Sequence, residues 1–264
     1  MFKELVERDV TCLKMSRTIL SRKLRVACSF LVDNLIIDAG APYFKKQLKS
    51  YYTNKPPQQA VFTHSHEDHA GNVDMLNMLN IIPYVHENAL AYFSAPPPIP
   101  YYRRFVWGTP AAGRCQKIGD ILKTDKYAFQ IIPTPGHSTD HICLYEEKMG
   151  WLFTGDLYVG ERVIYLYQNE DLFSIKESLR KLSELNFSSI FCSHRGPVAE
   201  GRDSLKRKLD HIESLQENAN RMKNNGADLK KITTALLGKE DYMYVISRGE
   251  FSKTAFVKAL LNTD

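Results

Sequence analysis

The sequence predicts an α/β protein in which β-sheet packs inside layers of helices. Runs rich in β-branched and aromatic residues dominate the first third of the chain. Strand-like and helix-like runs alternate through the middle, and nearly all residues after Gly201 have helical periodicity. Strands that alternate with helices are typical of a sheet covered by helices, so this pattern decides the fold class.

In the first half of the chain, strands and helices are expected in alternation. Two apolar, β-rich runs that end at Gly40 predict a pair of strands. Val73, Leu76 and Leu79 recur at spacings of three and predict a helix. The expected elements are strands at residues 24–32 and 35–38, a helix at 44–52, a strand at 59–63, a helix at 68–79 and a strand at 81–85.

The second half continues the alternation and then becomes helical. Its expected elements are strands at residues 128–133, 142–145 and 151–154, an amphipathic helix at 171–185 and a strand at 189–192. We expect a catalytic domain over residues 1–200 and a helical C-terminal extension over residues 201–264.

Residues 95–113 form the one segment without a clear period. Pro96–Pro98 and Pro100 block regular structure, so a long loop is expected there. Aromatic residues and two arginines follow in the stretch Tyr101–Trp107. Such a loop could form a wall of a pocket for a partly anionic substrate. Alternatively, its aromatic residues pack it onto the body of the protein or onto a second subunit of a homodimer.

The composition excludes several classes of protein. With 44% apolar and 25% charged residues in a chain of 264, the protein is globular rather than disordered or fibrous. The longest apolar run, residues 26–37, contains Asp33 and Asn34 and is too short to cross a membrane. The first 17 residues lack an apolar signal core, and the five cysteines form no CxxC pair. We therefore expect a cytoplasmic protein without membrane contact.

A cluster of histidines follows the strand expected at residues 59–63. His64, His66 and His69 lie within six residues and surround Asp68. Alternation along a strand places His64 and His66 on one side, and Asp68 and His69 follow in the turn that starts the next helix. Imidazoles and a carboxylate that converge at one strand end suit a zinc-type cation.

Three further strands also end in a possible ligand. These residues are His137, Asp156 and His194. Strand ends are where sites are assembled in α/β sheets, so all these side chains are expected at one place. The set of five histidines and two aspartates would be fully used by two metal ions that share a bridging carboxylate. Zinc, iron and manganese all accept such ligands.

These motifs resemble those of the metallo-β-lactamase superfamily over residues from about 20 to 200. The resemblance implies a four-layer αβ/βα sandwich with a dinuclear site at one edge of two packed sheets. It implies that one metal is held by His64, His66 and His137. It implies that Asp68, His69 and His194 hold the second metal and that Asp156 bridges the two.

The resemblance also suggests roles for residues beside the ligands. Asp38 matches the family's carboxylate that orients metal ligands, with a strand-terminal turn residue as the alternative. His141 is either a proton donor to the leaving group or, as we favour, a buried partner of the ligands. Tyr158 lies two residues after Asp156 and is a candidate substrate contact. Arg195 is either a contact for an anionic substrate or a surface ion-pair residue.

Within the superfamily, Asp156 argues against a true β-lactamase. The sequence is similar to the glyoxalase II-like and lactamase-like 2 groups, and Arg195-Gly196-Pro197 departs from the glyoxalase II pattern. The expected function is hydrolysis of an ester or thioester of a small molecule by a metal-bridging hydroxide that Asp68 binds and orients. An endoribonuclease or phosphodiesterase is the first alternative, and a single-iron persulfide dioxygenase is the second.

The charge of the chain gives little support to a nucleic-acid partner. The chain carries a net charge of +5, and residues 201–264 carry 12 Lys and Arg against 9 Asp and Glu. Their paired helices could hold nucleic acid as a degraded helix-turn-helix does. With so small an excess of positive charge, we favour a cap over the catalytic domain or a dimer contact instead.

Overall fold

The computed structural model describes residues 1–19 and 21–262 as two compact units. The first unit comprises Met1–Pro133, Asp140–Val159 and Phe187–Gly201. The second unit comprises Thr134–Thr139, Gly160–Asn186 and Arg202–Asp264. These units follow the packing of the chain, and the expected domain boundary at residue 200 stays a prediction.

The first unit contains two sheets, and the larger has seven strands in the order β1-β2-β3-β4-β5-β6-β7. Its strands are β1 (Phe2–Glu7), β2 (Val10–Ile19), β3 (Arg22–Val32), β4 (Leu35–Ile37), β5 (Gln59–Val61), β6 (Tyr84–Val85) and β7 (Gln116–Lys117). The first four strands pair antiparallel, and β4 to β7 pair parallel. Strands β1 and β2 were not predicted from the sequence, because charged residues interrupt their apolar positions.

The second sheet has six strands in the order β14-β13-β11-β10-β9-β8. Its strands are β8 (Ile121–Lys123), β9 (Ala128–Pro133), β10 (Ile142–Glu146), β11 (Trp151–Phe153), β13 (Ser189–Cys192) and β14 (Gly196–Val198). The strands expected at residues 128–133 and 189–192 are found with the same bounds. Residues Phe30, Phe153 and Phe191, buried to 1% exposure or less, belong to the apolar core that both sheets share.

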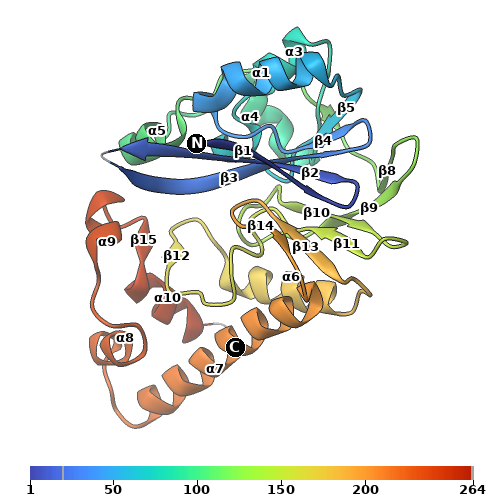
Figure 1. Ribbon diagram of the computed structural model, residues 1–264. Coiled ribbons are helices and arrows are strands. Elements are labelled where there is room, and N and C mark those ends of the chain that lie inside the picture. The colour runs from blue at the N-terminus through green and yellow to red at the C-terminus, as the bar shows by residue number, and fades with distance from the viewer. Residues whose placement is uncertain (20, 263–264) are drawn as a thin grey trace. The chain divides into compact units, whose positions relative to one another are not determined.

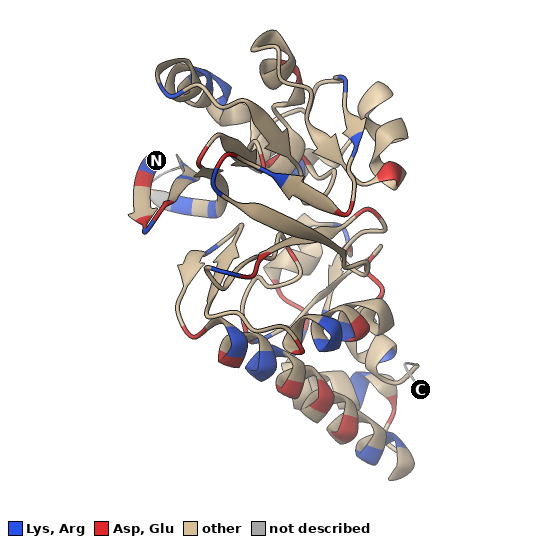
Figure 2. Ribbon diagram, turned by 90° about the vertical axis from the view of Figure 1, so that its right-hand side faces the viewer, with Lys and Arg blue, Asp and Glu red and all other residues tan. Residues whose placement is uncertain are grey.

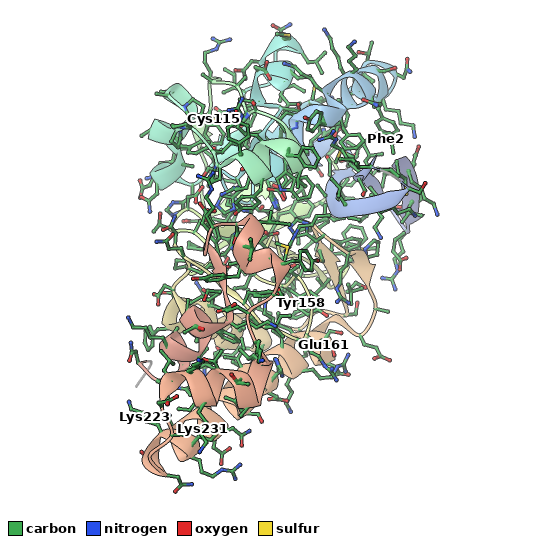
Figure 3. All side chains as sticks on the ribbon, turned by 90° about the vertical axis from the view of Figure 1, so that its left-hand side faces the viewer. Phe2, Cys115, Tyr158, Glu161, Lys223 and Lys231 are labelled. Carbon is green, nitrogen blue, oxygen red and sulfur yellow. The ribbon has the colours of Figure 1, made fainter. Side chains whose placement is uncertain are left out.

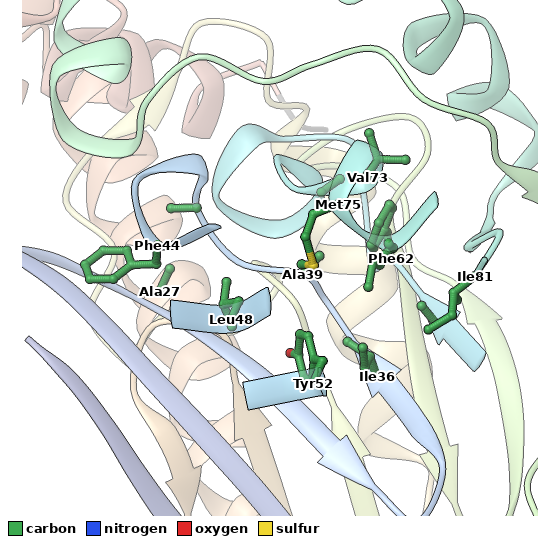
Figure 4. Packing of buried hydrophobic residues seen from close by; sticks show 14 of the residues in the cluster. Ala27, Ile36, Ala39, Phe44, Leu48, Tyr52, Phe62, Val73, Met75 and Ile81 are labelled. Atoms are coloured by element: carbon green, nitrogen blue, oxygen red, sulfur yellow. The ribbon is translucent and has the colours of Figure 1, made fainter. Parts of the chain in front are cut away.

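The outer face of the seven-stranded sheet is covered by helices. They are α1 (Lys45–Asn54), α2 (Glu67–Ala70), α3 (Val73–Met78), α4 (Leu90–Ser94) and α5 (Tyr101–Trp107). Figure 1 shows α1, α3 and α4 on one side of this sheet and the six-stranded sheet on the other. Figure 4 shows the core beneath the helices, where Leu48 and Tyr52 of α1 pack near Ile36 of β4.

Two expectations about this helical layer are corrected. The segment 95–113 is not a structureless loop, because α5 begins directly after Pro100 and ends at Trp107, before Gly108, whose φ is +99°. Proline is tolerated at the start of a helix, so the prolines delimit α5 rather than prevent it. The helix expected at residues 68–79 is interrupted at Gly71 and Asn72, where the Asn72 amide donates to the carbonyls of residues 39, 40 and 41.

The second unit is mostly helical, and helices follow Gly201 as expected. Its helices are α6 (Leu172–Ser183), α7 (Gly201–Asn224, of which Gly201 belongs to the first unit), α8 (Leu229–Leu237), α9 (Tyr242–Ile246) and α10 (Lys253–Leu260). Strands β12 (Leu166–Tyr167) and β15 (Phe251–Ser252) pair antiparallel. Figure 2 shows acidic and basic residues interspersed along α7, and Figure 3 shows Lys223 and Lys231 near the turn between α7 and α8.

The charges of α7 are thus mixed rather than gathered into one basic stripe. Among residues 1–19 and 21–262, no helix combines the length and apolar character needed to cross a membrane.

Candidate metal centre

The candidate site lies in the first unit, where several strands end close together. Asp38 follows β4, His64 follows β5, Asp156 follows β11, and His194 follows β13. The two sheets are joined near this place, because the Ile142 N–H donates to the Thr63 carbonyl at 2.8 Å. In the structure, donor atoms of His64, His69 and Asp156 lie within 4.8 Å of one another, and Asp156 lies beside His194.

Asp38 is the central acceptor beneath the site. It is 0% exposed, and its φ of +61° is in a region that non-glycine residues rarely adopt. Its carboxylate accepts from the Thr63 N–H at 2.8 Å, from His69 Nδ1 at 2.8 Å and from the Ser193 hydroxyl at 3.2 Å. Asp38 therefore joins the ends of β4, β5 and β13, as a carboxylate that orients ligands would.

The contacts of His69 determine which of its nitrogens faces the site. A carboxylate can only accept, so Nδ1 of His69 carries the proton that Asp38 binds. In the neutral ring, Nε2 then presents a lone pair toward Asp156 Oδ1 at 3.2 Å and Asp68 Oδ2 at 3.7 Å. Nε2 is buried and makes no hydrogen bond within the described part of the chain. A lone pair that faces carboxylate oxygens requires a cation or a proton between them.

His194 is oriented in the same way. Its Nδ1 donates to the Val26 carbonyl at 2.5 Å, so Nε2 again faces inward. This nitrogen lies 3.0 Å from Asp156 Oδ1, 3.1 Å from Oδ2 and 3.6 Å from Asp68 Oδ2. Imidazoles held at Nδ1 by an oxygen acceptor are typical of metal-binding histidines.

The acid–base properties of these groups follow from the crowding of carboxylates. Burial lowers the pKa of His69, but the charges of Asp156, Asp38 and Asp68 outweigh it and raise that pKa well above the usual value. Burial likewise lowers the pKa of His194, and Asp156 more than reverses this effect. Burial raises the pKa of Asp156, but His194 and His69 hold it well below the usual value. The site therefore favours positive charge at its centre.

The motif residues His64 and His66 supply further nitrogen donors. His64 Nε2 and His66 Nδ1 lie 3.0 Å apart, and His64 Nδ1 lies 3.1 Å from the Thr63 hydroxyl. Within the first unit, two sets have donor atoms within 4.8 Å of one another: His64, His69 and Asp156, and Asp68, His69 and His194. These nitrogen and oxygen donors, with an inward-facing Nε2 on His69, fit a zinc-type cation.

His137 belongs to the second unit and is described within it. Its Nδ1 donates to Glu170 Oε1 at 2.6 Å, so Nε2 is again the nitrogen available to a ligand. Glu170 was not among the residues predicted from the sequence. The role of His137 in holding the first metal, together with His64 and His66, stays a prediction.

The other expected residues differ in their surroundings. His141 is 1% exposed, and its Nε2 accepts from the Asp156 N–H at 3.1 Å, which favours the buried role. Tyr158 is also 1% exposed, so its role as a substrate contact stays a prediction. Arg195 is exposed, and its Nε donates to the Val159 carbonyl at 2.9 Å. Within the described residues, Arg195 has no ion pair.

Three residues outside the predicted ligand set contact residues of the site. Asp140 accepts from the Ser65 N–H at 2.8 Å. Arg103 pairs with Glu67, which is 0% exposed. Trp107 lies over the ring of His194, with ring centroids 6.1 Å apart and an interplanar angle of 28°. The spacing of four between Arg103 and Trp107, after Pro100, was the available sign that one helix face carries both.

The opposite face of α5 borders a hollow of about 440 Å³. It is lined by Pro42, Tyr43, Tyr101, Arg104, Phe105, Gly108 and Thr109. The Arg17 guanidinium lies over the Tyr43 ring, 3.9 Å from its centroid. Aromatic faces and guanidinium groups thus share an exposed surface beside the helix that reaches His194.

The fold and the site together define a protein with a cluster of histidines and aspartates at one edge of two packed sheets. Residues 23–194 match the family described as the Metallo-beta-lactamase superfamily. The chain belongs to this superfamily.

Two relatives agree with this assignment. The chain is 30% identical over 183 residues to a beta-lactamase-like protein 2 homolog of Caenorhabditis elegans, which covers 67% of this chain and 55% of that protein. It is 27% identical to a hydroxyacylglutathione hydrolase of Bdellovibrio bacteriovorus, over 51% of this chain and 47% of that enzyme. The matches thus span about half the length of these two relatives.

Solved structures confirm the fold class. A metallo-beta-lactamase family protein from Thermus thermophilus matches 96% of this chain and 92% of its own, with a TM-score of 0.69 and 18% identity. The expected α/β fold with two sheets, helical layers and C-terminal helices is therefore confirmed.

Proposed function

We propose that this protein is a two-metal hydrolase that cleaves an ester or thioester of a small, anionic molecule. The observation that carries the proposal is the pair of donor sets that share His69, with Asp156 close to the ring nitrogens of both His69 and His194. One carboxylate placed among the donors of both sets is suited to bridge two cations.

The proposed ligands are those of the family motif. His64, His66 and His137 would hold one cation, Asp68, His69 and His194 would hold the other, and Asp156 would lie between them. Two bound divalent cations would supply a hydroxide at neutral pH and would stabilise negative charge on the substrate. Zinc suits this donor set, and iron and manganese are the alternatives.

The chain's own groups would prepare the site for this chemistry. Asp38 holds His69 with Nε2 directed inward, and the Val26 carbonyl does the same for His194. Asp68 belongs to the second set, where its carboxylate would accept a proton from an attacking water and orient it. His141, which accepts from the Asp156 N–H, would fix the position of the bridging carboxylate.

The names of two relatives favour ester or thioester substrates. One is the hydroxyacylglutathione hydrolase of B. bacteriovorus, and another is an atrochrysone carboxyl ACP thioesterase of Aspergillus fumigatus, 25% identical over 57% of this chain and 42% of that enzyme. Acyl transfer to water needs an activated nucleophile and a group that stabilises the oxyanion, and two cations can supply both.

A nuclease is the second candidate, because α5 exposes aromatic and basic side chains. Tyr101 is 83% exposed and Phe105 54%, and Arg104 lies between them. Exposed aromatic rings beside guanidinium groups can stack on the bases of single-stranded nucleic acid. The mixed charges of α7 add no support for this candidate.

A panel of substrates separates these activities. The metal-loaded protein is assayed with an S-acyl glutathione, a lactone, bis-p-nitrophenyl phosphate and single-stranded RNA, and its metals are counted by elemental analysis. We expect two metals per chain and turnover of the first or second substrate. Turnover of RNA alone would establish the nuclease instead. One iron per chain, with dioxygen consumed in the presence of a persulfide, would establish the dioxygenase.

A further inference from the structure

One face of helix α5 contacts Glu67 and His194 of the candidate metal centre through Arg103 and Trp107, which lie one helical turn apart. The Arg103 guanidinium donates from Nε to Glu67 Oε1 at 2.7 Å and from Nη2 to Oε2 at 2.5 Å. Glu67 is 0% exposed and lies in the sequence between the donors His66 and Asp68. A helix distant in the sequence is thereby joined to the centre of the motif.

The ion pair between Arg103 and Glu67 restricts the positions of its two side chains more than an exposed ion pair would. An ionised carboxylate is costly to bury without a partner, so the Arg103 guanidinium stabilises the charged form of Glu67. The planar guanidinium binds both carboxylate oxygens at once, which fixes its orientation as well as its distance. The side chain of Arg103 is only 14% exposed, so solvent screens the pair weakly.

Trp107 gives α5 a second contact with the same donor set. Its indole is stacked on the ring of His194 and is only 7% exposed. The helix thus reaches the set Asp68, His69 and His194 from two sides, beside Asp68 through Glu67 and over His194 through Trp107.

We propose that Arg103 is a positioning residue that couples the placement of helix α5 to metal binding. Its pair with Glu67 holds the backbone on either side of Glu67, which carries His66 and Asp68, and seats Trp107 on His194. Loss of the pair therefore weakens metal binding and releases Trp107 together. The inference rests on the proposed metal centre but makes no assumption about the substrate.

The fluorescence of Trp107 gives a readout that is independent of activity. The chain has two tryptophans, and the buried indole N–H of Trp151 has no hydrogen-bond partner among the described residues. A Trp151→Phe parent therefore leaves Trp107 as the only tryptophan without removing a hydrogen bond. Acrylamide quenching then reports the exposure of Trp107, and a Co²⁺ titration reports the affinity of the metal site.

In this parent, Arg103→Gln should at least double the quenching constant and weaken Co²⁺ binding by about tenfold or more. The quenching constant and the Co²⁺ affinity of Arg103→Lys should lie between those of the parent and those of Arg103→Gln. An ammonium keeps the charge but cannot bind both carboxylate oxygens in one plane. Glu67→Gln should resemble Arg103→Gln. The variant with both substitutions should bind Co²⁺ no more weakly, and have a quenching constant no higher, than the more affected single variant. The reason is that the two residues act as a unit.

Arg104→Gln is the matched control, since it removes the same charge from the outer face of α5. It should leave both the quenching constant and the Co²⁺ affinity at the parental values. The inference is overturned if Arg103→Gln lowers only the melting temperature while the folded protein keeps parental quenching and Co²⁺ affinity. If Arg103→Gln does not fold, parental values for both Arg103→Lys and Glu67→Gln overturn it.

The result of this experiment can be told apart from the result of the substrate panel. Altered quenching and Co²⁺ affinity with no turnover of any panel substrate would leave this inference standing and reject the hydrolase. Turnover with unchanged quenching and affinity would do the reverse.

Discussion

The metal-donor motif at residues 63–69 and the segment at residues 95–113 differ in almost every physical respect. The motif is mostly buried, and His64, Glu67 and His69 are each exposed by 2% or less. The segment contains a short helix whose outer residues, Tyr101 and Phe105, are more than half exposed. Its inner residues, Arg103 and Trp107, contact Glu67 and His194 of the site.

This difference separates two tasks within one unit of the protein. Groups that bind cations must be held close together and away from water, so they lie at strand ends that backbone hydrogen bonds fix in place. Groups that select a substrate need access to solvent and tolerate change, so a short surface helix can carry them. Substitutions can test this separation, first at the residues of the metal centre and then on α5.

The largest effect is expected for Asp156→Ala. The variant removes the carboxylate that lies between His69 and His194, so one of the two metals should be lost. Loss of a residue that only hydrogen-bonds a metal ligand can lower activity by a factor of up to about 100. Loss of the bridging carboxylate should lower activity by at least this factor. Elemental analysis and turnover of the best panel substrate measure the two effects.

Asp120→Ala is the control for this variant, because it removes an exposed carboxylate from the same unit. It should keep both metals and full activity. An Asp156→Ala protein that still carries two metals would rule out the bridging role.

Removal of the metals should destabilise the protein in a pH-dependent way. The pKa values of His69 and His194 are raised without metal, so protonation of these rings stabilises the metal-free fold below about pH 6.5 and is lost as pH rises through the raised values. The lowered pKa of Asp156 has the opposite sign and acts only at acid pH, where stability is lost as pH falls below about 3.9.

Bound cations replace those protons and bind more tightly as pH rises. The difference in melting temperature between metal-loaded and chelator-treated protein should therefore widen from about pH 6 to about pH 8. At a metal concentration about 1,000 times the Kd, the stabilisation should reach about 4 kcal/mol. A difference that stays constant or narrows over this range would contradict the proposed competition between protons and metals.

Asp38→Asn should have an intermediate effect. Asparagine tolerates the positive φ at this position and keeps nearly the same shape, so the variant mainly removes the charge that orients His69. We expect metal affinity to fall by about 10- to 100-fold with little change in the fold. A Co²⁺ titration together with circular dichroism tests this expectation, and unchanged affinity would reduce Asp38 to a turn residue.

The smallest effect is expected on the outer face of α5. Phe105→Ala removes an exposed ring from the border of the hollow but leaves Arg103 and Trp107 in place. If this face binds substrate, KM should rise about fivefold, equivalent to about 1 kcal/mol, with kcat and metal content unchanged. An unchanged KM for every panel substrate would remove this face from the site.

Deleting residues 96–109 would not show whether this segment binds substrate. Replacing residues 96–109 with a short Gly-Ser turn looks harmless if the segment is a loop. In the structure it would remove Arg103 and Trp107, which contact Glu67 and His194, along with the exposed residues. Point variants on the outer face separate substrate binding from support of the metal site.

The sequence by itself determined most of the site's chemistry. Strand-ending residues are visible as apolar runs that stop at a histidine or an aspartate, and the spacing of residues 64–69 places several donors on one short stretch. These features are local, so the period of two along a strand is enough to predict them. The α/β class and the seven candidate donor residues followed from such local patterns, whereas the assignment of these residues to two metals came from the resemblance to the family.

Only the tertiary structure decided how these residues are oriented and what supports them. The bond from His69 to Asp38 spans 31 residues, that from His194 to Val26 spans 168, and Arg103 meets Glu67 across 36. No periodicity links residues so far apart, because their contact depends on the order of strands in the sheets and on where α5 packs. The same reason explains the error at residues 95–113: proline spacing indicates where a helix cannot continue, whereas burial of Trp107 and pairing of Arg103 help a seven-residue helix to form there.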